Sequence, residues 1–204
     1  MLVLLIVLLI SSTCAVICSV RLKTIEESLL ADHIFNSEDM VSLLNKERIT
    51  FRFGSYYAYS PLQKRIVIMQ KENYSYFDFF AILHEVGHQH DKESKSFIVF
   101  TYITILVRLI LFPICFVISI VNLLGIATIT PTYIVSFTCA LQALHIILLI
   151  YFERRASLFA FNSTKELFGI EKSKAFKYES FCSLSMQLSL EISLVVFVVL
   201  INTY

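Results

Sequence analysis

Charged residues are scarce in this sequence, and long stretches of the chain contain none. Only 16% of its 204 residues are charged, whereas 57% are hydrophobic. A soluble domain is ordinarily about half apolar, so this composition favours a membrane protein. The net charge is only +1, and no basic patch with interleaved aromatic residues occurs, so we expect no nucleic-acid partner.

Paired cysteines are also lacking. None of the five cysteines belongs to a C-x-x-C motif, and Cys115, Cys139 and Cys182 lie in or beside apolar runs. These three are therefore interpreted as small core or lipid-facing residues. The pattern excludes both a disulfide framework and a thiolate metal site.

Residues 1–20 carry no charge and are long enough to cross a bilayer. A basic segment before the apolar run and a small-residue cleavage site are both missing, so a retained anchor is favoured over a signal peptide. Lipoprotein cleavage before Cys14 or Cys18 is disfavoured in the same way, because Thr13 and Ile17 are poor residues in front of an acylated cysteine.

Three further stretches are apolar enough to span a membrane: residues 97–126, 133–152 and 182–203. A short uncharged turn at 127–132 joins the first two into a helical hairpin. Arg108 and Glu191 are charges at membrane depth, which are costly. We expect Glu191 to face the other helices and to pair with His145 or Arg108.

The distribution of basic residues predicts the topology. Ten of the 17 Lys and Arg residues lie in 21–96 and six lie in 154–177, leaving Arg108 alone within a span. Since positive charges mark the cytoplasmic side, residues 21–96 and 153–181 are expected inside and both termini outside. The expected fold is an all-α polytopic membrane protein with about four transmembrane helices and a small cytoplasmic α+β portion.

That α+β portion lies within residues 21–96. Residues 36–47 predict a short helix capped by Asn36 or Ser37. Residues 51–69 alternate in polarity around a Ser-Pro turn and predict a β-hairpin. Ser75 and Asp78 then have the spacing of a capping box that opens a further helix.

This further helix carries the motif H-E-V-G-H, formed by His84, Glu85 and His88. Positions i and i+4 share one helix face, so both imidazoles can bind one metal ion. Glu85 lies about 100° round the helix from His84, within reach of a water molecule at that metal. This H-E-x-x-H arrangement is typical of zinc peptidases.

Zinc of this kind needs a third protein ligand and an open position. The metzincin pattern is excluded, because Asp91 and Ser94 occupy its glycine and third-histidine positions. His90 points about 200° away from His88 on a helix, so it is interpreted as a solvated residue, and Asp91 as a supporting group near the metal. Glu153, at the inner end of the third span, is the better candidate.

Glu153 begins a face of small residues with helical spacing: Glu153, Ala156, Ser157 and Ala160. Small residues allow two helices to approach closely, which a shared metal requires. The alternative is that Glu153 simply pairs with Arg154 or Arg155 at the membrane surface.

H-E-V-G-H followed about 65 residues later by E-x-x-A-S-x-x-A resembles the YugP-type neutral zinc metallopeptidases of bacterial membranes. HtpX and the CAAX prenyl endopeptidases are more distantly similar. The resemblance implies one zinc ion per chain, held by His84, His88 and Glu153 on a gluzincin-like active-site helix, with Glu85 as catalytic base. It implies an endopeptidase in the bacterial plasma membrane, with its site on the cytoplasmic side, acting on peptides or membrane proteins.

The chain departs from the family pattern at several positions. Arg155 stands in place of an acid, Leu158 and Phe159 in place of an arginine pair, and Asp91 in place of a glutamine. These departures concern substrate preference more than metal binding. They leave an alternative open, in which the protein is a catalytically degenerate scaffold or protective partner that retains a metal site.

Overall fold

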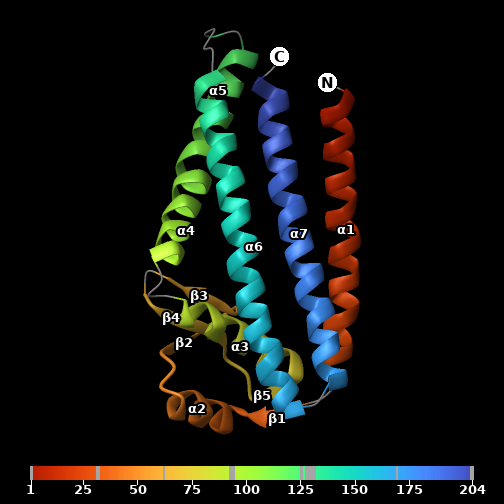
Figure 1. The fold of residues 1–204 in the computed structure, drawn as a ribbon, viewed down its shortest axis with the longest axis vertical. Coiled ribbons are helices and arrows are strands. Elements are labelled where there is room, and N and C mark those ends of the chain that lie inside the picture. Colours follow the sequence, from red (N-terminus) through yellow and green to blue (C-terminus); the bar gives the residue numbers. More distant parts are fainter. Residues whose placement is uncertain are drawn as a thin grey trace. The chain divides into compact units, whose positions relative to one another are not determined.

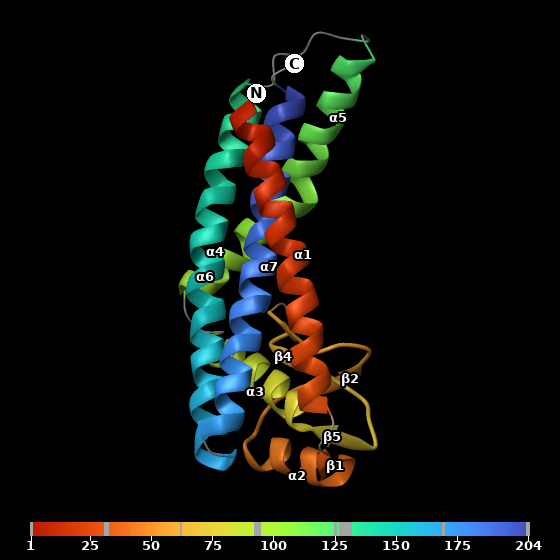
Figure 2. The ribbon, with the colours of Figure 1, turned by 90° about the vertical axis from the view of Figure 1, so that its right-hand side faces the viewer.

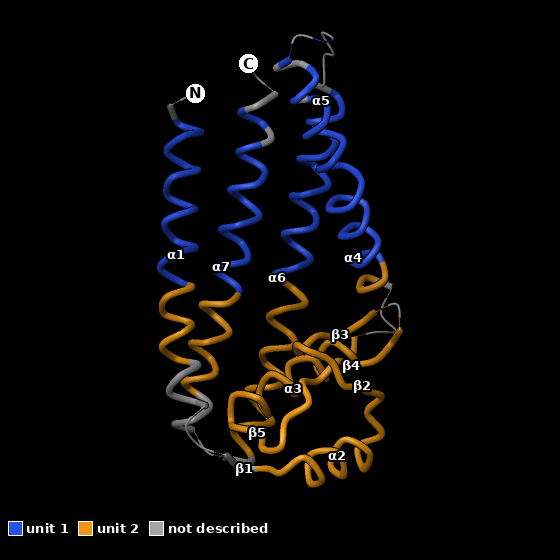
Figure 3. The backbone as a smooth tube through the Cα atoms, turned by 180° about the vertical axis from the view of Figure 1, so that it is seen from behind, with its two compact units in different colours: residues 1–18, 99–150, 184–204 blue, residues 19–98, 151–183 orange. Residues whose placement is uncertain are grey.

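The computed structural model describes residues 2–30, 33–61, 63–91, 95–124, 126, 132–168 and 170–202. Its backbone divides into two compact units, drawn in different colours in Figure 3. Unit 1 comprises Met1–Cys18, Val99–Ile150 and Leu184–Tyr204. Unit 2 comprises Ser19–Ile98 and Tyr151–Ser183.

Long helices dominate the chain (Figures 1 and 2). They are α1 (Leu2–Leu30), α4 (Lys95–Ile105), the π-helix η1 (Leu106–Leu111), α5 (Phe112–Leu123), α6 (Thr132–Phe168) and α7 (Ile170–Asn202). Four helical stretches among the described residues are long and apolar enough to cross a membrane: Val3–Ile25, Ser96–Ile118, Tyr133–Glu166 and Lys174–Phe197.

The four predicted apolar stretches are thus confirmed as helices, but their bounds differ. The third helix was expected to end as a span at residue 152, whereas α6 continues to Phe168. Arg and Glu are good helix formers, so the charges that follow residue 152 do not stop the helix. The predicted turn at 127–132 lies outside the described residues, apart from Thr132, where α6 begins.

Unit 1 has an apolar interior between α6 and the α4–η1–α5 segment. Its buried members are Ile103, Val107, Leu111, Phe112 and Cys115, with partly buried Leu106, Val135, Leu141 and Leu148 packed against them. Large apolar side chains also point outward, among them Leu9, Leu109 and Ile147. Lipid tails are as apolar as leucine, so such outer faces are expected of helices within a bilayer.

Unit 2 contains two small sheets. In one, β1 (His33–Asn36) pairs antiparallel with β5 (Asn73–Ser75). In the other, β4 (Arg65–Met69) lies between β2 (Phe51–Gly54), to which it is parallel, and β3 (Ala58–Ser60), to which it is antiparallel.

The predicted hairpin at 51–69 is therefore confirmed for β3 and β4 and wrong for β2. β2 joins the opposite side of β4 in parallel instead of forming a hairpin arm. The reason lies in β4, where three consecutive residues, Ile66, Val67 and Ile68, are buried. A strand buried on both faces is typical of a central position with a partner on each side.

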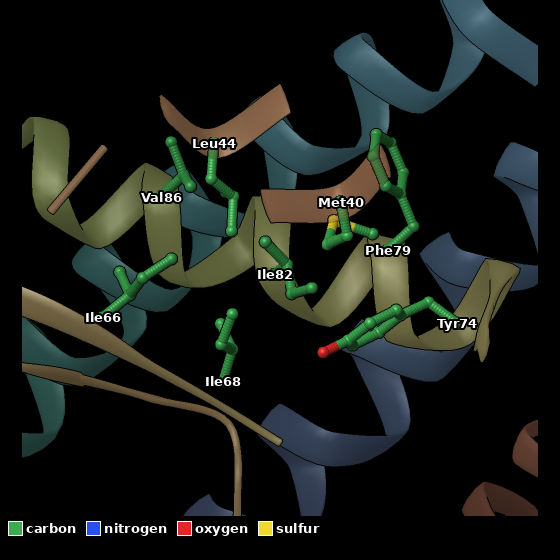
Figure 4. Close-up of a cluster of buried hydrophobic side chains, with 8 residues drawn as sticks. All are labelled: Met40, Leu44, Ile66, Ile68, Tyr74, Phe79, Ile82 and Val86. Carbon is green, nitrogen blue, oxygen red and sulfur yellow. The ribbon is translucent and has the colours of Figure 1, made fainter. Parts of the chain in front are cut away.

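The core of unit 2 forms where two helices pack on β4 and β5 (Figure 4). The helices are α2 (Ser37–Lys46) and α3 (Tyr76–His90), and Asn36 caps α2 as predicted, accepting a hydrogen bond from the Asp39 N–H at 2.8 Å. The core side chains are Met40, Leu44, Ile66, Ile68, Tyr74, Phe79, Ile82 and Val86. Because one face of α3 is buried here, its opposite face is left for His84 and His88.

Candidate metal centre

The start of α3 is fixed by a buried capping box, as predicted. The Ser75 hydroxyl accepts a hydrogen bond from the Asp78 N–H at 3.2 Å, and the Asp78 carboxylate accepts from the Ser75 N–H at 2.8 Å. Tyr57 Oη and Lys71 Nζ also donate to that carboxylate, at 2.8 and 2.5 Å. Burial raises the pKa of Asp78, but the bonds from Lys71, Ser75 and Tyr57 outweigh it, so the net pKa is lowered. The anion therefore fixes the helix register that places His84 and His88.

The two imidazoles of α3 meet the Glu153 carboxylate of α6 at one point. His84 Nε2 lies 3.2 Å from His88 Nε2 and 3.2 Å from Glu153 Oε2, and His88 Nε2 lies 3.4 Å from Glu153 Oε1. These are the only three described residues that form such a group of possible metal ligands. All three side chains retain some solvent exposure, 10% for His88 and about 20% for the other two.

The spacing of these atoms can be compared with the geometry of zinc. Zinc bonds to histidine nitrogen and carboxylate oxygen are about 2.0–2.2 Å long in a tetrahedral arrangement. Two ligand atoms of a regular tetrahedron of that size lie about 3.3–3.6 Å apart. The two Nε2 atoms are 3.2 Å apart, and each lies 3.2–3.4 Å from a different oxygen of Glu153, so each pair of atoms is close to this spacing. The residues fit a zinc ion with one coordination position left for water or substrate.

A close contact between α3 and α6 brings the ligands together. A Cβ atom added to Gly87 would lie 2.7 Å from the Cα of Ala156 and 3.1 Å from its carbonyl oxygen. Only glycine at 87 permits this approach, and Ala156 is itself fully buried. The small-residue face predicted on the Glu153 helix is therefore the surface on which α3 packs.

Further contacts hold the imidazoles in place. Ser157 Oγ lies 3.3 Å from His84 Nδ1, whereas the other ring nitrogen, Nε2, is the one that lies near His88 and Glu153.

 Packing around His88 is aromatic: its ring centroid lies 6.2 Å from that of Phe97, which in turn packs edge-on against Phe152 at 4.9 Å. Groups that bond or pack against ligating histidines fix the ring orientation and tune metal affinity. The contact of Ser157 with His84 was not predicted from the sequence.

Glu85 is held beside this group by the edge strand β3. Ile66, the β4 partner of Tyr59, donates its N–H to Thr50 O at 2.9 Å, on the β2 side of the sheet. The Tyr59–Ile66 pair therefore exchanges no hydrogen bonds, and the main chain of Tyr59 faces the open edge of β3. There the Tyr59 backbone hydrogen-bonds the Glu85 carboxylate.

The surroundings of the site change the proton affinity of two of its groups. Burial raises the pKa of Glu85 above its ordinary value, although His84, His88 and the bond from Tyr59 act in the opposite direction. Burial lowers the pKa of His84, but the hydrogen bond and charge of Glu153 outweigh this and leave it raised. The raised pKa makes Glu85 a stronger base than an exposed glutamate.

Comparison of the chain with family models, with curated proteins and with solved structures finds no match.

The structure separates the predicted ligands from their neighbours. It brings His84, His88 and Glu153 together, and it leaves His90 exposed, with its ring packed 4.9 Å from that of Phe159. Asp91 is buried and caps the C-terminus of α3. The alternative was a pairing of Glu153 with Arg154 or Arg155. Among the described residues, neither arginine pairs with it: Glu153 contacts His84 and His88, and Arg155 pairs with Asp91.

Proposed function

We propose that this protein is a membrane-embedded, zinc-dependent endopeptidase. The observation that carries the proposal is the triangle of three side chains, His84, His88 and Glu153: the two Nε2 atoms lie 3.2 Å apart, and each lies 3.2–3.4 Å from one of the two Glu153 oxygens. Such a group could hold a zinc ion. Glu85 follows His84 directly and lies beside the triangle without joining it. This combination of three ligands, an open position and an adjacent carboxylate supports peptide hydrolysis.

When bound, zinc supplies Lewis acidity, which polarises the scissile carbonyl and makes water a better nucleophile. Glu85 then acts as the base: its carboxylate takes a proton from the attacking water and delivers it to the nitrogen of the leaving amine. The raised pKa of Glu85 favours the first half of this transfer, because a stronger base takes the proton of the water more readily.

The substrate chain would be held by β3. Within the described residues this strand has a partner on one side alone, β4, and the main chain of Tyr59 faces the other side, next to Glu85. An extended peptide can add to such an edge through main-chain hydrogen bonds. Its scissile bond would then lie near the carboxylate that Tyr59 contacts.

The membrane location and its orientation are part of the same proposal. In the part of the chain that the structure describes, four apolar helical stretches are long enough to span a bilayer. The basic residues gather in 21–96 and 154–177, which favours a cytoplasmic position for the segments that carry His84, His88 and Glu153. Substrates would be peptides or membrane proteins reached from that side.

Metal content of the purified protein tests the proposal. We expect about one zinc ion per chain in the wild type and a strong loss of zinc in His84→Ala and Glu153→Ala, since each change deletes one ligand. His90→Ala is the matched control, because His90 is a histidine of the same helix outside the ligand group. Loss of zinc in His90→Ala with retention in Glu153→Ala would show that the third ligand is wrong.

A further inference from the structure

A second cluster of polar side chains lies within unit 1, among helices that are otherwise apolar. Glu191 of α7 accepts hydrogen bonds from Arg108 of η1 and from Gln142 Nε2 of α6, the latter at 2.5 Å. His145 lies three residues beyond Gln142 on α6, so the two side chains share one face of that helix. All four residues belong to helical stretches that are long and apolar enough to cross a membrane. Ionisable groups in such stretches are costly and often functional.

His145 is the member of this cluster whose polar atoms the protein leaves unsatisfied. The residue is 1% exposed, and both ring nitrogens are buried with no hydrogen-bond partner among the described residues. Burial of unpaired polar atoms is costly. A phenylalanine or leucine would fill the space without that cost, so packing alone does not account for a histidine at this position.

The surroundings of His145 are suited to its protonated form. Its ring is stacked on that of Phe100 of α4, with the ring centroids 5.4 Å apart and the planes 8° from parallel. A cation within about 6 Å of an aromatic ring centre is attracted to the face of the ring. Among the described residues, the charged groups that act on His145 are Glu191 and Arg108. Glu191 is therefore the anion with which a protonated imidazole can pair, and Arg108 is the competing cation.

Arg108 is placed so that it can leave the Glu191 carboxylate. Half of its side chain is exposed, whereas the Glu191 side chain is 8% exposed. Arg108 also lies in the π-helix η1. Such helices are rare, occur frequently at functional sites, and hold one more residue in each hydrogen-bonded turn than an α-helix does. Return of η1 to α-helical geometry would turn Arg108 about the helix axis, away from its present partner.

From these observations we propose that His145 is a proton-binding site that controls the Arg108–Glu191 ion pair. While His145 is neutral, Glu191 holds Arg108 and so joins η1 to α7. A proton taken from the solvent by the imidazole makes His145 the partner of Glu191, and Arg108 is released towards its exposed side. The proposal concerns unit 1 alone, and it depends neither on zinc nor on peptide cleavage.

Thermal unfolding of the full-length protein in lipid nanodiscs tests this exchange of partners. Arg108→Leu should lower the Tm at about pH 8, because Glu191 then lacks its cation. At about pH 4.5, below the ordinary range of histidine, protonated His145 takes that place, and we expect the loss of Tm to fall to about half or less. Acid acts equally on the metal ligands of both proteins, so that effect cancels in the difference.

Two histidine variants then assign the pH dependence. In a His145→Phe background, which keeps an aromatic ring against Phe100, the loss of Tm caused by Arg108→Leu should be the same at both pH values. His90→Phe, at an exposed histidine of α3, is the control and should leave the pH dependence unchanged. A pH dependence that persists in the His145→Phe background would mean that Glu191 itself takes the proton, and it overturns the proposal.

Solid-state NMR of the protein in liposomes, labelled with nitrogen-15 histidine, follows the protonation itself. The signals of His145 are those missing from His145→Phe, or from His145→Gln if the phenylalanine variant does not fold. We expect the wild-type imidazole to become protonated between about pH 8 and about pH 4.5, and to stay neutral over that range in Glu191→Gln, which lacks the anion. A wild-type His145 that stays neutral, or one that titrates in the same way in Glu191→Gln, overturns the proposal.

Discussion

Arg155 of α6 and Asp91, the residue that caps α3, form an ion pair with Nη2 and Oδ1 2.9 Å apart. Asp91 is buried, whereas half of the Arg155 side chain is exposed and lies against the Tyr151 ring, 5.5 Å from its centre. The pair joins α3 to α6 close to the ligand group. Asp91 lies three residues beyond His88, and Arg155 lies two residues beyond Glu153. This contact was not predicted from the sequence, which suggested Asp91 as a supporting group near the metal and Arg155 as a possible partner of Glu153.

We expect Arg155→Ala to lower zinc affinity about tenfold. Loss of a group that supports metal ligands typically lowers metal affinity by about 10–100-fold, and we expect an effect at the lower end of that range. The change leaves the buried Asp91 carboxylate without its cation, which loosens the junction of α3 and α6. Arg154→Ala is the control, because Arg154 is the exposed neighbour and has no described ion pair. Chelator competition measures both affinities, and equal zinc binding by the two variants would contradict a positioning role for Arg155.

Gly87→Ala should weaken zinc binding although alanine is the better helix former by about 1 kcal/mol. The new Cβ would meet the backbone of Ala156 at 2.7 Å, so α3 and α6 must separate. Separation moves Glu153 away from His84 and His88. Chelator competition again gives the affinity, and a Gly87→Ala protein that binds zinc as tightly as wild type would show that this contact does not set the site.

Asp78→Asn should cost about 3 kcal/mol of stability at neutral pH, because it removes a buried, paired carboxylate from the capping box. The folded-state pKa of Asp78 is lowered below its ordinary value of 3.8. Its contribution is therefore fully present above about pH 4 and is lost as the pH falls through the folded value. Thermal unfolding across this range should show the gap between wild type and variant closing below pH 4, and a constant gap would contradict this linkage.

Within unit 1, Glu191 accepts hydrogen bonds from Arg108 and from Gln142 Nε2, the latter at 2.5 Å. Glu191→Leu should lower stability by about 3 kcal/mol, because it leaves both donors without their acceptor. Glu191→Gln should cost less, and Leu190→Ala, at an exposed neighbour, least of all. Thermal unfolding in detergent measures the order, and a Leu variant as stable as wild type would contradict it.

Local patterns in the sequence predicted much of this structure. The spacing of His84 and His88, the Ser75–Asp78 box and the uncharged runs each depend on residues close together in the chain, and each is found where expected. Glu191 was expected to pair with His145 or Arg108, and it pairs with Arg108.

Pairings between distant segments were harder to predict. The parallel contact of β2 with β4, the β1–β5 sheet and the Arg155–Asp91 pair depend on how the chain returns on itself. Nothing in the local alternation of residues 51–69 distinguishes a hairpin arm from a parallel partner. The uninterrupted Ile66–Val67–Ile68 run was the available signal, since such a run indicates a central strand.

The most direct test of the central claim compares zinc-loaded wild type with Glu85→Gln on one panel of peptides and membrane proteins. Glutamine keeps the shape of Glu85 but cannot take the proton of the attacking water. We predict that the variant keeps its zinc and its thermal stability while cleavage falls by at least about a hundredfold. Cleavage by the variant at the wild-type rate, or a wild-type protein that binds zinc and cleaves nothing in the panel, would contradict the account.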